Sequence, residues 1–535
     1  MKRILCIAAA AAAFAASFFM REGNISGRVA HADEAEQAST FADMLRGGKY
    51  EYNPNGPHGP TLYYYAYACH RLPALKNFDM AQEANISINA PAQSKGDGVS
   101  LDTLRKLLAP WLAFIFLCYL LGAFAGRAAA WWACACLALS GLSCIYAGYF
   151  VHEIIFAAAV FAAAQFLWAF FKTPSLGRAA LAGAFAGLAQ ATKETSVIAF
   201  FALFISSAAA LAILPDFRKN LFGLGPKKIA ASFAVFCAAF FAVFCAFYSS
   251  FGSNPRGIVD AFLAYGHFAG KSASADFREP FWYYLRLLFA SKSEGAWFGE
   301  LPISALFCAG TAIAAARLAR DCEPDRRRAA AYIIFCAIAA ALQFAVLSCL
   351  SYKTPWLLLS PVALMCAPAG YAAAVLLESR RAVAWIPAFA ALCALGYWQF
   401  GLSYNAAVAY PHDPRNPMIL SHTVSDYKNL LSRIADAERV SDYGADIPIA
   451  FVAGGESPWP APWDLRNYPN AGFWGDGVPE NLKDFEMVVA CSPEAAEKIG
   501  KILGDSGYVS EYFGLRKNVV LTVYIKRKLF EKIVQ

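Results

Sequence analysis

The chain has 535 residues, of which 58% are hydrophobic and only 16% are charged, and its formal net charge is +7. Soluble domains carry about a quarter charged residues, so this composition excludes an ordinary soluble protein and indicates an integral membrane protein. The basic residues fall in short loops between hydrophobic segments, as the positive-inside rule requires, and are therefore no sign of nucleic-acid binding. The sequence has neither a Walker A motif nor a Gly-x-Gly-x-x-Gly motif between a strand and a helix, which argues against a nucleotide-sugar enzyme or an ATP-driven pump.

Hydrophobic runs of roughly 20 residues, the length that crosses a bilayer, recur from the N-terminus to about residue 402. The first, residues 4–20, follows Lys2 and Arg3 and shares the pattern of a signal peptide, but we expect a retained helix. A long polar segment, residues 21–100, is expected outside the membrane. Three more spans are expected at 101–124, at 128–148 and in a segment that ends at Lys172.

Residues 179–214 are rich in alanine and glycine and are interrupted by Lys193-Glu194. One long helix with a buried Lys-Glu pair is the alternative, but it would place Arg178 and Arg218 on opposite sides of the membrane. Both arginines favour the cytoplasm, so we predict a hairpin of two helices with its break at the outer face. Gly183 and Gly187 would allow close packing of these helices against their neighbours.

The remaining spans are expected at 229–250, 301–318, 329–350, 354–377 and 382–402, which gives about eleven in total. The basic loops agree with this odd number, so the N-terminus is expected in the cytoplasm and the C-terminus outside. We therefore predict a multi-pass protein of the cytoplasmic, or inner, membrane, with a transmembrane domain over residues 1–402.

Residues 403–535 have the composition of a globular domain and are expected to form a small extracytoplasmic α/β domain. Short apolar runs predict buried strands at 447–453 and 485–490, and a helix is expected at 492–503. A final pair of strands is expected at 508–515 and 519–526. The predicted fold class is thus mainly α, a polytopic helical bundle with a small α/β domain at its C-terminus.

The few ionisable residues outside the basic loops fall at the ends of hydrophobic segments, and the topology places those ends on one face of the membrane. Charge near hydrocarbon is costly, so charged residues there are expected to have a function. We therefore expect a site at this face. The residues concerned are Asp33-Glu34, His58, His152-Glu153, Lys193-Glu194 and Tyr352-Lys353.

The pair Asp33-Glu34 comes shortly after the first span. Adjacent carboxylates in this place can accept a proton from an acceptor hydroxyl or bind a divalent cation. The alternative is a helix cap, because Asp33 opens a helix-forming run at 34–45. The turn around His58 and the tyrosines after it, Tyr63 among them, favour a site.

Lys193 and Lys353 stand at outer helix ends, where their ammonium groups could reach a lipid phosphate. The alternative for each is a snorkelling lysine that places its charge at the membrane interface. Lys353 is the stronger candidate, because Thr354-Pro355-Trp356 fixes it at a helix start.

Several motifs in order along the chain carry a family resemblance. The Asp-Glu pair after the first helix, the His-Gly-Pro-x-Leu-Tyr-Tyr motif that begins at His58, and the many helices resemble the GT-C membrane glycosyltransferases. More narrowly, the chain resembles the protein-O-mannosyltransferase-like branch, glycosyltransferase family 39-like, and within it the flippase-activity-associated family of archaeal-type glycosylation loci. Further similar stretches are 191–195, 352–356, 413–417 with 422–423, and 459–463.

The resemblance implies transfer of a sugar from a polyprenyl-phosphate carrier to an acceptor on the outer face. It assigns Asp33 as the catalytic base, with Glu34 in support or binding a divalent cation, Mg²⁺ or Mn²⁺. His152 and Glu153 match an acidic position that helps bind metal or substrate, although a helix cap at the interface is the alternative. The expected substrate-binding residues are His58, Tyr63, Lys193, Glu194, Lys353 and Trp356.

Chemistry independently suits an outward-facing transferase that inverts the anomeric centre. Displacing a lipid phosphate from a sugar needs a base on the acceptor side and cations on the phosphate side. The alternative is a non-catalytic accessory protein or a transporter for lipid-linked sugars, for which inverted repeats and polar residues near the bilayer midplane are typical. The polar residues of this sequence gather at one face, which favours the enzyme. The acceptor is open among protein, lipid and glycan.

Overall fold

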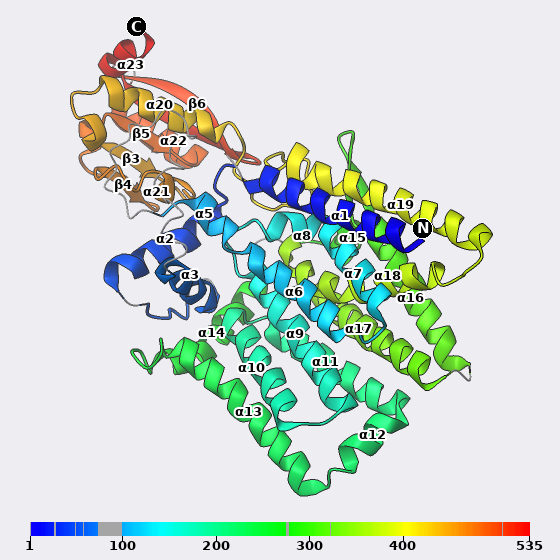
Figure 1. Cartoon of the computed structure of the whole chain (residues 1–535). Helices are drawn as coiled ribbons and strands as arrows, with labels where there is room; N and C mark the ends of the chain where they lie inside the picture. The colour runs from blue at the N-terminus through cyan, green and yellow to red at the C-terminus, as the bar shows by residue number, and fades with distance from the viewer. Residues whose placement is uncertain are drawn as a thin grey trace. The chain divides into compact units, whose positions relative to one another are not determined.

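A computed structural model describes residues 2–25, 28–48, 50–56, 58–72, 99–273, 278–320, 323–504 and 507–535. The chain divides into two compact units (Figure 1). Unit 1 comprises the described residues within Met1–Ile25, Lys49–Ala68 and Arg105–Pro411. Unit 2 comprises those within Ser26–Gly48, Cys69–Leu104 and His412–Gln535. Two of the boundaries between the units fall within helices, namely α3 (Thr61–Arg71) and α5 (Leu101–Lys106).

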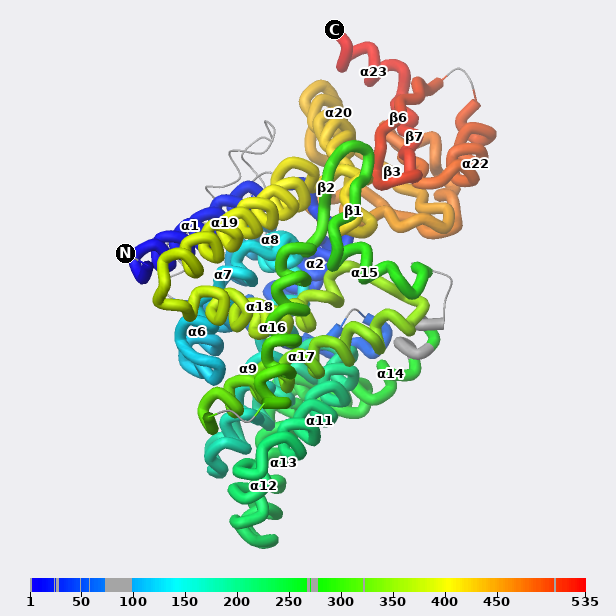
Figure 2. The backbone as a smooth tube through the Cα atoms, turned by 90° about the vertical axis from the view of Figure 1, so that its right-hand side faces the viewer, coloured from blue at the N-terminus to red at the C-terminus, as the bar shows by residue number. Residues whose placement is uncertain are grey.

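Unit 1 is a bundle of helices with one small hairpin of strands. Its elements are α1 (Lys2–Ile25), α6 (Ala109–Gly122), α7 (Arg127–Leu139), α8 (Gly141–Tyr146), α9 (Glu153–Lys172), α10 (Leu176–Thr192), α11 (Ser196–Ile213), α12 (Pro215–Phe222), α13 (Pro226–Tyr248), α14 (Gly257–Ala273), α15 (Tyr283–Leu288), β1 (Ala290–Ser293), β2 (Ala296–Gly299), α16 (Leu301–Ala319), α17 (Pro324–Cys349), η2 (Pro355–Leu358), α18 (Leu359–Leu376), α19 (Ala382–Tyr404) and η3 (Asn405–Ala409). Figure 2 shows α1 running beside α19, and α16 beside α17.

Within the described part of the chain, nine helices are long and apolar enough to cross a membrane. The protein is therefore a polytopic membrane protein, as its sequence predicts. Two further spans expected from the sequence correspond to shorter helices. The expected span 128–148 is divided at Ser140 into α7 and α8, and the first half of the expected hairpin is the 17-residue α10.

The predicted break at Lys193-Glu194 is confirmed, because α10 ends at Thr192 and α11 begins at Ser196. Lys193 caps α10 in an extended conformation, with φ −156° and ψ 140°. The glycines of α10 allow its backbone to approach α13. A Cβ atom on Gly183 would lie 2.1 Å from the carbonyl oxygen of Phe236, so only glycine fits at this contact.

Unit 2 contains the small α/β region that the sequence predicts near the C-terminus, together with an N-terminal segment that the sequence analysis places in a loop of the transmembrane domain. Its elements are α2 (Ala32–Gly47), α20 (Tyr427–Val440), η4 (Gly444–Asp446), β3 (Ile449–Val452), α21 (Ala461–Asp464), β4 (Ala471–Trp474), η5 (Leu482–Asp484), β5 (Met487–Ala490), α22 (Pro493–Leu503), β6 (Tyr508–Arg516), β7 (Val519–Lys526) and α23 (Arg527–Val534). The five strands form one sheet in the order β4-β3-β5-β7-β6, with β3 parallel to both β4 and β5.

The two faces of this sheet contribute to separate hydrophobic clusters. Ile449 and Phe451 of β3 belong to one cluster, and Ala450 and Val452 belong to the other. Side chains alternate across a strand, and here both faces are covered, which is why this strand reads as a continuous apolar run. Val29 of the N-terminal segment packs in the first of these clusters, so unit 2 combines parts of the chain that are distant in sequence.

Candidate functional site

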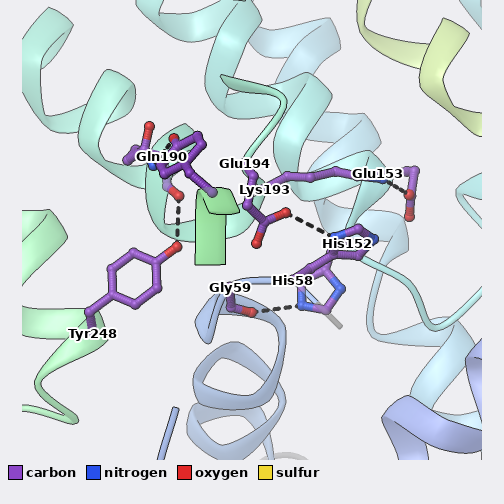
Figure 3. A network of polar contacts seen from close by, with 9 residues as sticks. His58, Gly59, His152, Glu153, Gln190, Lys193, Glu194 and Tyr248 are labelled. Carbon is purple, nitrogen blue, oxygen red and sulfur yellow. Dashed lines mark hydrogen bonds and ion pairs between the residues drawn. The ribbon is translucent and has the colours of Figure 1, made fainter. Parts of the chain in front are cut away.

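Three segments of unit 1 bring five polar side chains and one glycine together (Figure 3). The loop before α3 supplies His58 and Gly59, the start of α9 supplies His152 and Glu153, and the break between α10 and α11 supplies Lys193 and Glu194. We call these six residues the turn network. Five of them are among the residues that the sequence analysis selected, and Tyr63 lies beside them, with its ring centroid 5.7 Å from that of His152.

The Lys193 ammonium donates to the Glu153 carboxylate, and this ion pair is buried. The side chain of Lys193 is 3% exposed and that of Glu153 is 6% exposed. A buried pair in this setting is stable only if both charges remain, because removing one leaves the other without compensation. Lys193 is therefore a fixed cation below the surface, unlike a snorkelling lysine, whose charge would reach solvent.

His58 and Glu194 form the second contact of the turn network. The Nδ1 atom of His58 lies 3.1 Å from Oε2 of Glu194, and the His58 side chain is 25% exposed. His58 has φ +57°, in the left-handed region that non-glycine residues rarely adopt and that is frequent at functional sites. The imidazole is thus the most accessible group of the network while its partner carboxylate is buried.

Gly59 sets how closely the His58 loop approaches the end of α10. Its backbone N–H donates to Thr192 O at 3.1 Å, and a Cβ atom in its place would lie 2.1 Å from Ala191 O. Thr61 Oγ1 donates to Thr192 Oγ1 at 2.9 Å and adds a second link. The His-Gly-Pro motif is therefore explained by packing, since only glycine permits this contact.

His152 is completely buried and joins the His58 loop to the start of α9. Its Nε2 atom lies 2.8 Å from Gly59 O, so Nε2 carries the proton and donates it. Burial and the neighbouring His58 lower the pKa of His152 to about 3, which keeps the imidazole neutral. Its Nδ1 atom is buried and finds no partner among the described residues, so it offers an acceptor at the centre of the network.

Tyrosines surround the turn network on the side of α13. Tyr248 donates from its hydroxyl to Gln190 O at 3.1 Å, as Figure 3 shows, and its ring packs edge-on against Tyr52. Burial, reinforced by the charge of Glu194, raises the pKa of Tyr52. The hydroxyl of Tyr52 has no hydrogen-bond partner in the described part of the chain. Tyr52, Gln190 and Tyr248 lie far apart in the chain and were not among the predicted site residues, because only their aromatic or amide character could have suggested them.

Lys353 and Trp356 lie at the start of η2, where the sequence analysis places them, and have contacts of their own. The Lys353 ammonium donates to the backbone carbonyls of Glu279, at 2.8 Å, and Leu350. Burial lowers the pKa of Lys353, and the charge of Glu279 opposes this effect. The ring of Trp356 packs edge-on against Tyr146 of α8, with 5.9 Å between centroids. Both carbonyl contacts hold the lysine in place without neutralising its charge.

Asp33 and Glu34 belong to unit 2, where they begin α2. His31 is the N-cap, and its ring accepts from the backbone N–H of Asp33 at 3.1 Å. Glu34 accepts from the backbone N–H of His31 at 3.2 Å, which completes a capping box, and pairs with Arg28 at 2.7 Å. The capping alternative therefore holds for this pair, with His31 rather than Asp33 as the cap. Asp33 is half-buried.

The residues expected to bind a divalent cation, Glu34, His152 and Glu153, do not fit one as they lie. Glu153 is ion-paired with Lys193, and Glu34 is ion-paired with Arg28 in the other unit. Over the described ranges, no three His, Cys, Asp or Glu side chains lie close enough to bind a metal ion.

The architecture resembles that of known proteins. No family model and no curated protein matches the sequence. Solved structures do match. ArnT from Cupriavidus metallidurans bound to undecaprenyl phosphate has a TM-score of 0.56 and 14% identity over 98% of this chain and 98% of that one. Its apo structure gives a TM-score of 0.57 and 14% identity over 97% of each chain.

A second neighbour is the Archaeoglobus fulgidus oligosaccharyltransferase in complex with Zn and sulfate, with a TM-score of 0.50 and 13% identity over 98% of this chain and 76% of that one. At such identities a likeness establishes the fold. It covers nearly all of this chain in both cases and includes the bundle of membrane helices. The chain thus has the GT-C fold of polytopic membrane glycosyltransferases.

Proposed function

We propose that this protein is a membrane glycosyltransferase that takes a sugar from a polyprenyl-phosphate carrier and transfers it to an acceptor hydroxyl at the outer face of the cytoplasmic membrane. One observation carries the proposal: the fixed, buried cation Lys193 and the more exposed His58 converge at one end of a GT-C bundle. The ArnT structure bound to undecaprenyl phosphate supports a lipid-linked donor. The acceptor is left open among protein, lipid and glycan.

The turn network would stabilise the leaving phosphate of the carrier. As the bond between the sugar C1 and the phosphate oxygen breaks, negative charge develops on that oxygen, and preorganised donors lower the barrier most. When both of its nitrogens carry a proton, His58 can donate from Nε2 while Nδ1 donates to Glu194, and Lys193 supplies a fixed positive charge beneath. Glu153 would position Lys193, and Tyr63 would pack beside the sugar or carrier.

Asp33 is proposed as the base that accepts the proton of the acceptor hydroxyl, on the strength of the Asp-Glu motif. Attack on C1 opposite the departing phosphate would invert the anomeric centre. Glu34 is a less suitable base, because its carboxylate is buried against Arg28 and caps α2. We propose a positioning role for it. Lys353 and Trp356 remain proposed contacts of the carrier at the neighbouring turn.

The proposed orientation follows the loop charges. Arg320 and Arg326 at the α16–α17 connection, and Arg380 and Arg381 before α19, would face the cytoplasm. The helices that meet at the turn network would have their other ends at the cytoplasmic face, so the turn network itself would face outward.

The experiment is sugar transfer from radiolabelled polyprenyl-phosphate-sugars in proteoliposomes, with wild-type protein, Asp33→Asn and the matched control Asp43→Asn. Asp43 is on the same helix, is exposed and pairs only with its neighbour Arg46 among the contacts described. Loss of a general base is expected to reduce the rate about 10²–10⁴-fold in Asp33→Asn and to leave the control unchanged. Equal rates for all three proteins would exclude Asp33 as the base.

The same vesicles separate the enzyme from the alternative. If no protein releases label from any carrier but the labelled lipid changes leaflet, a transporter or accessory role replaces the transferase. If wild-type protein transfers label and His58→Ala reduces the rate, the turn network is part of the enzyme.

A further inference from the structure

A pocket of about 380 Å³ lies among the loop after α6, the ends of α9 and α16, the helices α12 and α18, and the start of α17. Its place relative to the turn network follows from α9, which begins at Glu153 in that network and ends at Lys172 in the wall of the pocket. The 20 residues of α9 span about 30 Å, which is the thickness of the hydrocarbon core of a bilayer. The pocket therefore lies at the opposite membrane face, which is the cytoplasmic face in the proposed orientation.

The basic residues that line this pocket outnumber its carboxylates. The basic residues are Lys172 at the end of α9, Arg317 near the end of α16, and Arg326 and Arg328 near the start of α17, and the carboxylates are those of Asp325 and Glu378. Two positive charges are therefore in excess among the described residues of the lining, and we call this cavity the basic pocket. The positive-inside rule accounts for basic residues in each loop, but not for their convergence from three helices on one cavity.

The ion pairs show which cations carry this excess. Arg328 Nη2 lies 3.1 Å from Asp325 Oδ1, so these two charges compensate each other. Glu378 is shared, because its Oε2 atom lies 2.9 Å from Arg317 Nη2 and its Oε1 atom lies 3.7 Å from Arg326 Nη2. A single carboxylate neutralises only one of two guanidinium groups, and the shorter contact is that of Arg317. The charge of Arg326 is therefore left largely uncompensated.

Lys172 and Arg326 also have unused hydrogen-bond donors. The 3.7 Å between Arg326 and Glu378 is too long for a hydrogen bond. The described residues offer the Lys172 ammonium no carboxylate partner, and its Nζ atom lies 5.8 Å from the centroid of the Phe124 ring. Both side chains are exposed, so a ligand can reach them. An ammonium with three N–H donors and a guanidinium with five are groups that bind the oxygens of a phosphate.

The inner wall of the basic pocket is aromatic, and we call its three rings, those of Phe124, Trp168 and Phe217, the aromatic floor. Trp168 is 1% exposed, and its ring packs edge-on against Phe217, with 4.9 Å between centroids. It lies one helical turn before Lys172 on α9, on the side of the membrane interior. A free phosphate would contact only the basic residues, whereas an anionic lipid would also place apolar atoms against these rings. The combination favours a lipid.

We propose that the basic pocket binds the head group of an anionic phospholipid, with Lys172 and Arg326 donating to the phosphate oxygens and the glycerol end of the lipid lying against the aromatic floor. Basic pockets between membrane helices at the cytoplasmic side are suited to such head groups. The thickness of the bilayer would separate this lipid from the turn network. The proposal therefore goes beyond sugar transfer, and it stands whether or not the protein transfers sugars.

The test measures lipid binding to the full chain, delipidated in detergent, by native mass spectrometry. Phosphatidylglycerol is the probe, and phosphatidylcholine, which has the same phosphate but a compensating positive charge, is its matched control. We expect phosphatidylglycerol to bind about tenfold more tightly, because its negative charge is not compensated within the lipid. Inorganic phosphate at millimolar concentration should not displace it, because the free ion makes no contact with the aromatic floor.

Two double variants locate the site. Lys172→Gln with Arg326→Gln should weaken the binding of phosphatidylglycerol about 30-fold, as the loss of two basic contacts predicts. Lys219→Gln with Arg320→Gln removes the same charge from exposed residues outside the lining of the basic pocket and should leave the affinity unchanged. All four side chains are exposed, so both variants should fold, and their melting temperatures check this.

Three results would overturn the proposal. Equal weakening by both double variants would show a general attraction to a positive face instead of a site. Displacement of phosphatidylglycerol by inorganic phosphate would identify a soluble anion as the ligand. Tighter binding of polyprenyl phosphate than of phosphatidylglycerol, lost in Lys172→Gln with Arg326→Gln, would assign the basic pocket to the sugar carrier.

Discussion

Lys193 and Glu153 form a buried ion pair in unit 1. Both side chains are more than nine-tenths buried, and they neutralise each other. The net contribution of this ion pair to the stability of the protein is small, because the cost of desolvating two ions offsets most of their attraction. That pair is a reason to expect function, since two apolar residues of the same size would pack at least as well.

We predict that Glu153→Gln destabilises the protein by about 3–5 kcal/mol, because it leaves the Lys193 ammonium buried without a counter-ion. The double variant Glu153→Leu with Lys193→Met should recover most of this loss but remain inactive in sugar transfer. Thermal unfolding in detergent and the proteoliposome assay measure the two effects. Recovery of transfer in the double variant would show that the pair is only structural.

His152 gives a prediction on pH. Its pKa in the folded protein is about 3, below the value of about 6.5 for a free histidine, so the unfolded chain binds the proton more readily. The stability that His152 contributes is complete above about pH 6.5 and is lost as the pH falls toward 3. Between pH 6.5 and 5 the loss should be about 2 kcal/mol.

This loss should disappear in His152→Gln and persist in His70→Gln, a variant of a half-buried histidine on α3. Melting temperatures at a series of pH values measure it. An unchanged pH dependence in His152→Gln would mean that His152 is not held neutral by its surroundings.

Among the elements, the His58 loop and the end of α10 form the contact that brings the turn network together. Its closeness depends on Gly59, whose replacement by any larger residue would place a Cβ atom 2.1 Å from Ala191 O. The carbonyl of Gly59 also accepts from His152, so a shift of this loop would disturb α9 as well.

Gly59→Ala should therefore destabilise the protein by about 1–3 kcal/mol and reduce sugar transfer, because His58 moves away from Glu194. Gly266→Ala is the matched control, since a Cβ atom there has no neighbour within 4 Å. The melting temperature and the initial rate of sugar transfer, measured on both variants, test this prediction. Wild-type values for Gly59→Ala would show that the loop can move without consequence.

In the whole molecule, unit 2 combines the segment after α1 with the C-terminal residues in one compact unit. Val29 lies in the hydrophobic cluster of the sheet, Thr423 donates to Ala30 O at 2.7 Å, and His31 Nε2 lies 2.8 Å from Leu420 O. The segment that bears Asp33 thus depends on residues that follow about 390 positions later.

Truncation after Pro411 should consequently expose Val29, leave α2 without its support and abolish sugar transfer, although the turn network is retained. Truncation after Lys526 removes α23 and Gln535, including Leu529 of the same cluster, and should be tolerated better because Val29 and the sheet remain. Protease sensitivity of the 28–48 segment and size-exclusion chromatography in detergent measure the effect. A protected, monodisperse protein after the longer truncation would show that this segment folds without the C-terminal residues.

Sequence patterns predicted the elements well where a single physical rule acts locally. Hydrophobic length fixed most membrane helices, the Lys193-Glu194 interruption predicted the break between α10 and α11, and apolar runs predicted β3 and β5. The same reasoning did not predict α20 or β4, whose patterns are weaker. It also treated α7 and α8 as one span, because a single serine gives little sign of a helix end.

Local sequence patterns were sufficient to predict a membrane protein, the turns between most of its helices and the polar residues at those turns, because hydrocarbon tolerates charge only at defined places. The pairing of these residues came only from the tertiary structure: Lys193 with Glu153, His58 with Glu194, and Glu34 with Arg28. Such pairings join residues up to 136 positions apart. Hydrophobic periodicity indicates which face of a helix a residue occupies. The partner of that residue depends on how the helices pack against one another, which no local sequence pattern predicts.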